Sequence, residues 1–439
     1  MTNYSKIKSS GGISEYLLKT NGLTVLLLEE HSAPVVTFMV TYLVGSRNEA
    51  LGHTGATHLL EHLMFKGSRN YNKDSGDTIW TLLQNVGARL NATTWLDRTN
   101  YFELLPKEHL ESAMAVEADR MRYALLRDSD RQPEMTVVRN EFERGENDPW
   151  ESLEKSMWAT AYQAHPYHHS TIGWQSDIEG VSTERLRQFY DTYYWPNNAT
   201  VTVIGDFQAK QVLSLIERQF GALPSSPEPI PEMYTTEPRQ QGPRRFIIKR
   251  TGEAGIVGVA YKTPPGSHPD NYPLAVLNNL LSSGKTSRFY RLLIDSGLAT
   301  NVQVGNHPFR DNGLFMIYAF LTPDTGHEQV ENLILETLEQ VKNEGVEDQE
   351  VARAQAMAKA QVAFSRDGSY SIASALNEAI SMGDWTYYTT FLDRLTEVTA
   401  TEVQRVARLY LEEDQSTTGW FVPLADKSDG GTEVMDPAK

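Results

Sequence analysis

The sequence predicts an α+β fold with two homologous domains, each an antiparallel-rich β-sheet covered by helices. The chain has 439 residues, too many for one ordinary hydrophobic core. Short runs of β-branched and aromatic residues are interspersed with longer segments of helical period. The second half repeats the pattern of the first at an offset of 217 residues, which places Tyr193 on Tyr410. A duplicated unit of sheet and helices accounts for all three observations.

The composition excludes several classes of protein. A content of 40% hydrophobic and 22% charged residues is typical of a globular chain, neither disordered nor membrane-spanning. There are 57 acidic and 40 basic residues, and the net charge of −17 disfavours binding to nucleic acid. The chain has no cysteine. Disulfides and thiolate ligands are therefore excluded, and any metal must be held by His, Asp or Glu.

The amino-terminal residues give an expectation for the cellular compartment of the protein. Residues 1–12 lack the apolar core of a secretory signal, which predicts a cytoplasmic location; a periplasmic location stays open if a leader has been removed. We expect residues 1–13 to form an N-terminal extension. The apolar run 35–44 is much shorter than the roughly 20 residues of a membrane helix, so we expect a buried strand and no membrane insertion.

The elements of the first half follow in order. Residues 14–45 predict two or three strands, with a turn at Gly22. A short amphipathic helix comes next. Residues 88–95 and 99–104 predict paired strands on which this helix can rest. A structural helix is predicted over residues 107–126, because its apolar residues recur at helical spacing.

The short amphipathic helix carries the pattern His-Leu-Leu-Glu-His from His58 to His62. At about 3.6 residues per turn, the two histidines lie on one face of the helix with Glu61 beside them. Neutral imidazoles bind zinc, and a nearby carboxylate that does not bind the metal can take a proton from zinc-bound water. This order is the inverted form of His-Glu-x-x-His. The alternative is an amphipathic helix that happens to carry two histidines.

A further helix is predicted to begin near Pro133, a residue favoured in the first turn. It carries Glu134 and Glu141 two turns apart on one stripe. A catalytic zinc needs three protein ligands, so one of these glutamates is the expected third ligand. The alternative is that both are simply solvated. Four other histidines lie in apparent loops without ligand spacing, and we expect them at the surface: His53, His165, His168 and His169.

Composition divides the chain into its expected parts. Residues 222–245 are rich in proline and predict a linker. We expect a metal-bearing catalytic domain at 14–221 and a homologous metal-free domain at 246–424. Residues 425–439 are rich in Asp, Gly and small polar residues and predict a disordered tail.

The second copy of the short helix predicts a fold without metal chemistry. Its apolar face survives at the offset of 217 residues, whereas the polar residues of the motif change. His58, Glu61 and His62 become, in that order, Ala275, Asn278 and Asn279.

With the inverted motif, the paired glutamates and the duplication, the chain resembles the pitrilysin and mitochondrial processing peptidase family of zinc metallopeptidases over roughly residues 14–423. It is most similar to the zinc-bearing subunit of the two-domain bacterial type. The resemblance implies that the two domains form half of a clamshell. It also implies one Zn²⁺ per chain, held by His58, His62 and Glu141, with Glu61 as catalytic base and Glu134 as a supporting acid.

The resemblance extends to residues that bind substrate. Asn91, Ala92 and Thr93 are similar to the family's edge strand, which binds an extended peptide as an additional strand. Processing peptidases use acids shortly after the zinc glutamate to bind a basic residue near the cleavage site. Glu151 fits one such position, and Lys155 occupies the other.

One departure from the family pattern predicts a partner. Active members need an Arg and a Tyr from a second-half domain, and Leu293 and Thr300 stand at those positions here, with Arg291 out of register. Split members of the family pair a zinc-bearing subunit with a homologous metal-free subunit that carries the Arg and Tyr. The resemblance therefore implies a heterodimer of this kind, with a homodimer as the alternative.

The main hypothesis is a zinc-dependent endopeptidase that hydrolyses oligopeptides or presequence-like peptides in a closed chamber. The alternative is a non-catalytic core or scaffold subunit of a larger complex, motivated by the missing Arg and Tyr. A small-molecule hydrolase that uses the same zinc is a third hypothesis.

Overall fold

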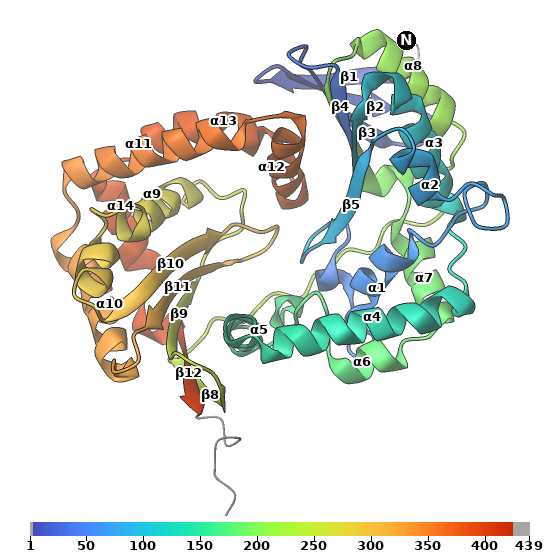
Figure 1. Ribbon diagram of the computed structural model, residues 1–439. Helices are drawn as coiled ribbons and strands as arrows, with labels where there is room; N and C mark the ends of the chain where they lie inside the picture. Colours follow the sequence, from blue (N-terminus) through green and yellow to red (C-terminus); the bar gives the residue numbers. More distant parts are fainter. Residues whose placement is uncertain (1–2, 425–439) are drawn as a thin grey trace, which may run out of the picture.

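The protein folds into two lobes, each built on one β-sheet (Figure 1). The computed structural model describes residues 3–424, so the predicted tail at 425–439 lies outside the described residues. The first sheet has seven strands in the order β1-β2-β3-β7-β4-β6-β5, and the second has five in the order β10-β11-β9-β12-β8. Helices cover both sheets. The predicted α+β fold with two sheet-and-helix halves is confirmed.

The first sheet follows the strand pattern that the sequence predicts. The expected turn at Gly22 joins the antiparallel strands β2 and β3, and the expected pair of strands on either side of Trp95 is β5 and β6. The segment expected to be an extension carries β1, whose residues pair with β2 along the sheet edge. The strands are β1 (Tyr4–Ser10), β2 (Ile13–Leu18), β3 (Leu23–Glu29), β4 (Val35–Tyr42), β5 (Arg89–Thr94), β6 (Thr99–Pro106) and β7 (Ala199–Gly205).

The helices of the first lobe include one that begins earlier than predicted. The helix expected near Pro133 begins at Asp128, because Asp128 accepts hydrogen bonds from Thr183 Oγ1 at 2.8 Å and Arg131 Nε at 3.0 Å. These contacts hold an extra turn ahead of the proline. The helices are α1 (Ala56–Leu63), α2 (Ile79–Gln84), α3 (Leu110–Tyr123), α4 (Asp128–Asn147), α5 (Pro149–Ala161), α6 (Gln175–Gly180), α7 (Thr183–Tyr193) and α8 (Ala209–Phe220).

The second lobe contains a smaller sheet and six α-helices among the described residues. Its strands are β8 (Arg244–Thr251), β9 (Ile256–Lys262), β10 (Ala299–His307), β11 (Leu314–Leu321) and β12 (Ser416–Leu424). Its helices are α9 (Asn271–Ser282), α10 (His327–Glu344), α11 (Asp348–Ser365), α12 (Ser369–Met382), α13 (Thr386–Thr396) and α14 (Ala400–Tyr410). Across residues 3–424, no helix combines the length and apolar character that a membrane span requires.

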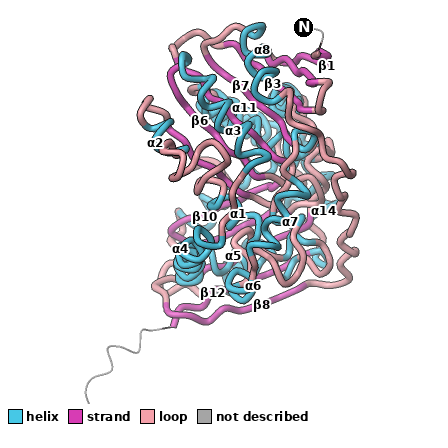
Figure 2. The backbone as a smooth tube through the Cα atoms, turned by 90° about the vertical axis from the view of Figure 1, so that its right-hand side faces the viewer, coloured by secondary structure: helices cyan, strands magenta, loops and turns pink. Residues whose placement is uncertain are grey.

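The two sheets share one topology. The order β3-β7-β4-β6-β5 in the first sheet corresponds strand for strand to β8-β12-β9-β11-β10 in the second. Both contain a single parallel pair among these strands, β3 with β7 and β8 with β12, and Figure 2 shows β8 and β12 at one edge of their lobe. Helix α9 takes the place of α1, and α14 takes the place of α7. The repeat predicted from the sequence is therefore a repeat of the fold.

Each lobe packs one of its helices against the sheet of the other lobe. Met157 on α5 packs in one hydrophobic cluster with Ala260 and Phe421 of the second sheet. In the reverse direction, Leu376 on α12 packs with Leu26 of the first sheet. Helices α5 and α12 are counterparts in the repeat, and Figure 1 shows each against the opposite lobe. This exchange joins the lobes through two apolar interfaces.

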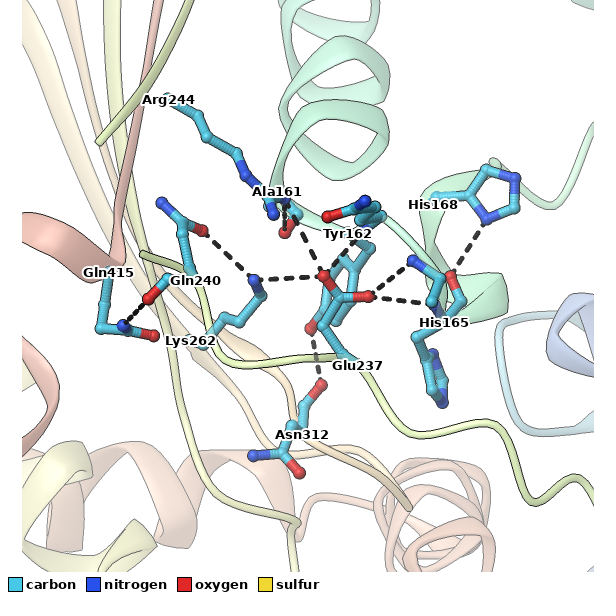
Figure 3. Close-up of polar contacts among 12 residues, drawn as sticks. Ala161, Tyr162, His165, His168, Glu237, Gln240, Arg244, Lys262, Asn312 and Gln415 are labelled. Carbon is cyan, nitrogen blue, oxygen red and sulfur yellow. Dashed lines mark hydrogen bonds and ion pairs between the residues drawn. The ribbon is translucent and has the colours of Figure 1, made fainter. Parts of the chain in front are cut away.

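Hydrogen bonds attach the predicted linker to both lobes. Glu237 accepts hydrogen bonds from the backbone N–H groups of Gln163, Ala164 and His165 at 2.8 to 3.0 Å, and from Lys262 Nζ at 3.4 Å (Figure 3). Burial raises the pKa of Glu237, but the backbone donors outweigh burial and lower it below its ordinary value. The carboxylate is therefore charged at neutral pH and connects the linker to the loop after α5.

The loop held by Glu237 contains one of the histidines expected at the surface. That prediction is wrong for His165, which is 3% exposed. Its Nε2 atom lies 3.1 Å from Asp311 Oδ2 of the second lobe. The residue belongs to the junction between the lobes, because the linker and the loop between β10 and β11 cover a segment that looks exposed in the sequence.

Candidate metal centre

Helix α1 is fixed by its apolar face and by its first turn. Leu59, Leu60 and Leu63 are fully buried in the core of the first lobe. The buried carboxyl group of Glu49 accepts hydrogen bonds from the backbone N–H groups of Gly55 and Thr57 at 2.8 and 2.7 Å, which satisfies donors at the start of the helix. The histidine face of α1 is thereby held toward α4.

The backbone conformation just before α1 requires glycine at position 55. Gly55 has a φ of 86°, and a Cβ atom there would lie 2.4 Å from the carbonyl oxygen of Ile172. The backbone before the helix therefore packs directly against the loop 170–173.

Three side chains of α1 and α4 converge on one point. Glu141 Oε2 lies 3.9 Å from His58 Nε2 and 3.8 Å from His62 Nε2. Each residue offers one ligand atom within 4.8 Å of the others, and no second group of this kind occurs among residues 3–424. Ligand atoms around a tetrahedral zinc lie about 3.4 Å apart. The observed spacing therefore fits a bound zinc after a small movement of the side chains.

The protonation state of His58 suits a metal ligand. Burial, with a smaller contribution from His62, lowers the pKa of His58 to about 3. The imidazole is therefore neutral at neutral pH, and one ring nitrogen keeps a free lone pair. Neutral imidazole is the form that binds zinc.

Glu134 lies on the other side of His62 from Glu141. Its Oε1 atom is 2.8 Å from His62 Nδ1, and its Oε2 atom pairs with Lys66. Burial raises the pKa of Glu134, but the contacts with Lys66 and His62 outweigh burial and lower it. A charged Glu134 fixes the ring orientation that turns His62 Nε2 toward Glu141. Of the two glutamates left open by helical spacing, the geometry favours Glu141 as the ligand.

Glu61 lies beside the cluster without joining it. Its Oε2 atom accepts a hydrogen bond of 2.5 Å from Thr94 Oγ1 on β5. Burial raises the pKa of Glu61 above its ordinary value, and Thr94 opposes that rise. Sequence reasoning missed this partner of Glu61, because the two residues are brought together only when α1 packs against β5.

A cavity of about 700 Å³ opens onto these groups, and we call it the metal-site pocket. The edge strand β5 forms one wall, and helices α4 and α5 form another. The cavity brings together eight of the nine residues that the sequence singled out as ligands, base, supporting acid or substrate contacts; the ninth, Glu134, lies behind His62. Its lining includes His58, Glu61, His62, Asn91, Ala92, Thr93, Glu141 and Glu151.

One residue of the pocket wall differs from the sequence expectation. His169 was expected at the surface, but it is 2% exposed and lines the pocket, and burial lowers its pKa to about 4. That prediction is wrong, because the loop 170–173 packs on the start of α1. Lys155 forms an ion pair of 2.6 Å with Glu146, which neutralises a cation close to Glu151.

The positions expected to carry the family's Arg and Tyr lie outside the metal-site pocket. Leu293 is fully buried in the core of the second lobe. Thr300 on β10 donates a hydrogen bond from Oγ1 to the carbonyl oxygen of Phe320. Neither residue lines the pocket.

Comparison with known proteins links the fold to a family. Residues 24–174 match the family model described as insulinase (peptidase family M16), and residues 180–358 match that of the peptidase M16 inactive domain. Over 408 residues the chain is 31% identical to the zinc protease PqqE of Helicobacter pylori, covering 92% of this chain and 91% of that protein.

Two further comparisons extend this similarity. Over 403 residues the chain is 28% identical to the probable mitochondrial-processing peptidase subunit beta of Schizosaccharomyces pombe, covering 88% of this chain and 86% of that protein. The crystal structure of a protease from Helicobacter pylori is similar, with a TM-score of 0.89 and 30% identity. It covers 94% of this chain and 99% of that chain.

Proposed function

Because this chain belongs to peptidase family M16, we propose that it is a zinc-dependent endopeptidase that hydrolyses extended peptides. The observation that carries the proposal is the convergence of His58, His62 and Glu141, with Glu61 beside them, at the wall of one cavity. The three ligands hold one Zn²⁺ per chain. Their chemistry, two neutral imidazoles and a carboxylate, is a ligand set typical of catalytic zinc.

Different residues of the chain have different roles in hydrolysis. Zn²⁺, when bound, supplies a Lewis acid that polarises the scissile carbonyl and lowers the pKa of water. Glu61 accepts a proton from the attacking water and donates it to the leaving amine. Its raised pKa suits both transfers, because a group with a pKa nearer neutrality can take up and release a proton. Glu134 keeps the His62 ring in its binding orientation.

Substrate binds along the free edge of β5. Asn91, Ala92 and Thr93 lie on this edge strand and line the metal-site pocket, so an extended peptide adds as a further strand through main-chain hydrogen bonds. Glu151 lies on the opposite wall and serves as a contact for a basic side chain. The ion pair between Lys155 and Glu146 leaves Glu151 free to do so.

Replacing Thr94 with valine tests the role of its hydrogen bond to Glu61. The bond lowers the pKa of Glu61, so its loss is expected to raise that pKa further. Since the base acts in its deprotonated form, the acidic limb of the kcat/KM profile should move to higher pH, by about one unit for a bond of about 1.4 kcal/mol. Peptide hydrolysis measured between pH 5 and pH 9 checks this. An unchanged acidic limb would mean that Thr94 does not act on the base.

We propose that the Arg and Tyr that bind the substrate come from a partner subunit. Leu293 is buried, and Thr300 binds a backbone carbonyl, so neither offers a cation or a phenol to the substrate. A heterodimer with a homologous metal-free subunit supplies the Arg and Tyr and closes the peptide chamber, with a homodimer as the alternative. The relative named as a subunit of mitochondrial-processing peptidase supports this arrangement. A cytoplasmic location stays a prediction.

The purified chain tests the proposal through its metal content. We expect about one Zn²⁺ per chain, and peptide cleavage that disappears with a chelator and returns with added zinc. We also expect weak cleavage by the chain alone and a large gain when a homologous partner is added, with the assembly measured by light scattering. A folded protein that binds no zinc would support the alternative of a scaffold subunit. Full activity in a homodimer would overturn the heterodimer.

A further inference from the structure

The second lobe retains a cavity at the place that corresponds to the metal-site pocket. This second pocket, of about 460 Å³, lies between the end of β10 and helices α9, α11, α12 and α13. Its lining includes Ala275 and Asn278, the counterparts of His58 and Glu61, and Phe309 in the loop after β10. Duplication has therefore kept the cavity while the metal ligands were replaced.

The second pocket is lined mainly by apolar and aromatic side chains. Tyr387, Tyr388 and Phe391 of α13 form one wall, Met382 of α12 another, and Phe309 a third. The rings of Tyr387 and Phe391 lie 5.4 Å apart in a tilted arrangement. A concave site with aromatic walls and few polar groups is typical of a binding pocket for a large apolar group.

Two polar groups at the second pocket lack partners. Asn278 and Asn306 both line it, and the Oδ1 atom of each is buried without a hydrogen-bond donor from residues 3–424. An amide oxygen left without a donor costs about 1 to 3 kcal/mol. Both oxygens are shielded in this conformation, so an N–H or O–H donor on a bound aromatic group reaches them once the amide side chains turn toward the cavity.

The second pocket is continuous with the path of the peptide. Trp95 follows directly after β5 and lines both pockets. Arg98 gives a second link, because it donates to the carbonyl oxygen of Thr93 on β5 at 3.0 Å and to Glu378 in the lining of the second pocket at 2.5 Å. A peptide added to β5 that continues past Thr94 therefore reaches the rim of the second pocket.

We propose that the second pocket binds a tryptophan or tyrosine side chain of the same peptide that adds to β5. The pocket holds the aromatic side chain while the scissile bond lies at the metal-site pocket. Peptides that span both places are therefore preferred over shorter ones. This inference rests on the proposed function, since the ligand is the peptide substrate.

Peptide binding to the Glu61→Gln variant tests the proposal without cleavage. The probes are labelled peptides about twelve residues long, which extend to about 40 Å, each with a single Trp at a different position or Ala in its place. We expect Trp at one position, separated from the cleavage site, to lower the Kd by about 10- to 100-fold relative to Ala. Fluorescence anisotropy of the label measures the Kd.

Filling the pocket should remove this preference. Ala375 on α12 lines the pocket and is half-buried, so Ala375→Phe in the Glu61→Gln background is expected to make the Trp and Ala peptides bind alike. Ala275→Phe fills the pocket from α9 and provides the same test of the Trp preference if the first variant fails to fold. The matched control is Ala352→Phe, at an exposed position of α11 outside the pocket, which should keep the preference.

The possible outcomes separate this inference from the proposed function. If the Glu61→Gln protein binds all peptides alike while the wild type cleaves them, the second pocket has no such role and the endopeptidase stands. If the Trp preference survives in the pocket-filling variants, the pocket is not its cause and the inference is overturned. If the zinc-loaded wild type neither binds nor cleaves any peptide, the proposed function itself fails.

Discussion

Replacing Glu61 with glutamine is expected to lower kcat for peptide hydrolysis by about 10²- to 10⁴-fold while leaving zinc binding intact. Glu61 does not belong to the group of ligand atoms, so its charge is not needed to hold the metal. Glutamine has the same shape and can still accept the hydrogen bond from Thr94, but it cannot take a proton from water. Steady-state cleavage and zinc content, measured on the same preparation, check both parts of the prediction.

A second acid of the same cavity provides the control for this experiment. Glu154 lines the metal-site pocket, and burial raises its pKa, so Glu154→Gln changes a carboxyl group in the same wall. This variant should keep most of its kcat, because the change does not touch the base. If Glu61→Gln hydrolyses peptides as fast as the wild type, another group activates the water and the assignment fails.

The metal-site residues of α1 could be predicted because their geometry is local. His58 and His62 share a helix, so helical spacing alone places them on one face. The roles of Glu134 and Glu141 could not be separated in this way, since both lie on one stripe of α4. Their difference arises from how α4 packs across α1, which puts one carboxylate at His62 Nδ1 and the other near the Nε2 atoms.

Long-range packing also accounts for what the sequence missed. The repeat predicted that the two halves share a fold, but an amphipathic pattern shows only that a helix has an apolar face. It does not tell which sheet the face meets, so the exchange of α5 and α12 between lobes could not be foreseen. His165 and His169 were expected at the surface for the same reason, because distant segments cover their loops.

Glutamine substitutions at Glu141 and Glu134 are expected to weaken zinc binding to different degrees. Glu141→Gln replaces an anionic ligand, so we expect zinc affinity to fall by more than about 100-fold. Glu134→Gln removes the charge behind His62 and the pairing with Lys66, but it leaves all three ligands in place. For this variant we expect a smaller loss, of about 10- to 100-fold. Competition with a chromogenic chelator measures both affinities.

The order of these two effects decides between the two glutamates. Glu143→Gln is the matched control, because Glu143 lies on the same helix, is more than half exposed and pairs only with Arg139 among the described residues. It should bind zinc like the wild type. A larger loss in Glu134→Gln than in Glu141→Gln would make Glu134 the ligand. Helix α4 would then have to turn relative to α1 when zinc binds, because Glu134 now faces His62 Nδ1 and Glu141 faces the Nε2 atoms.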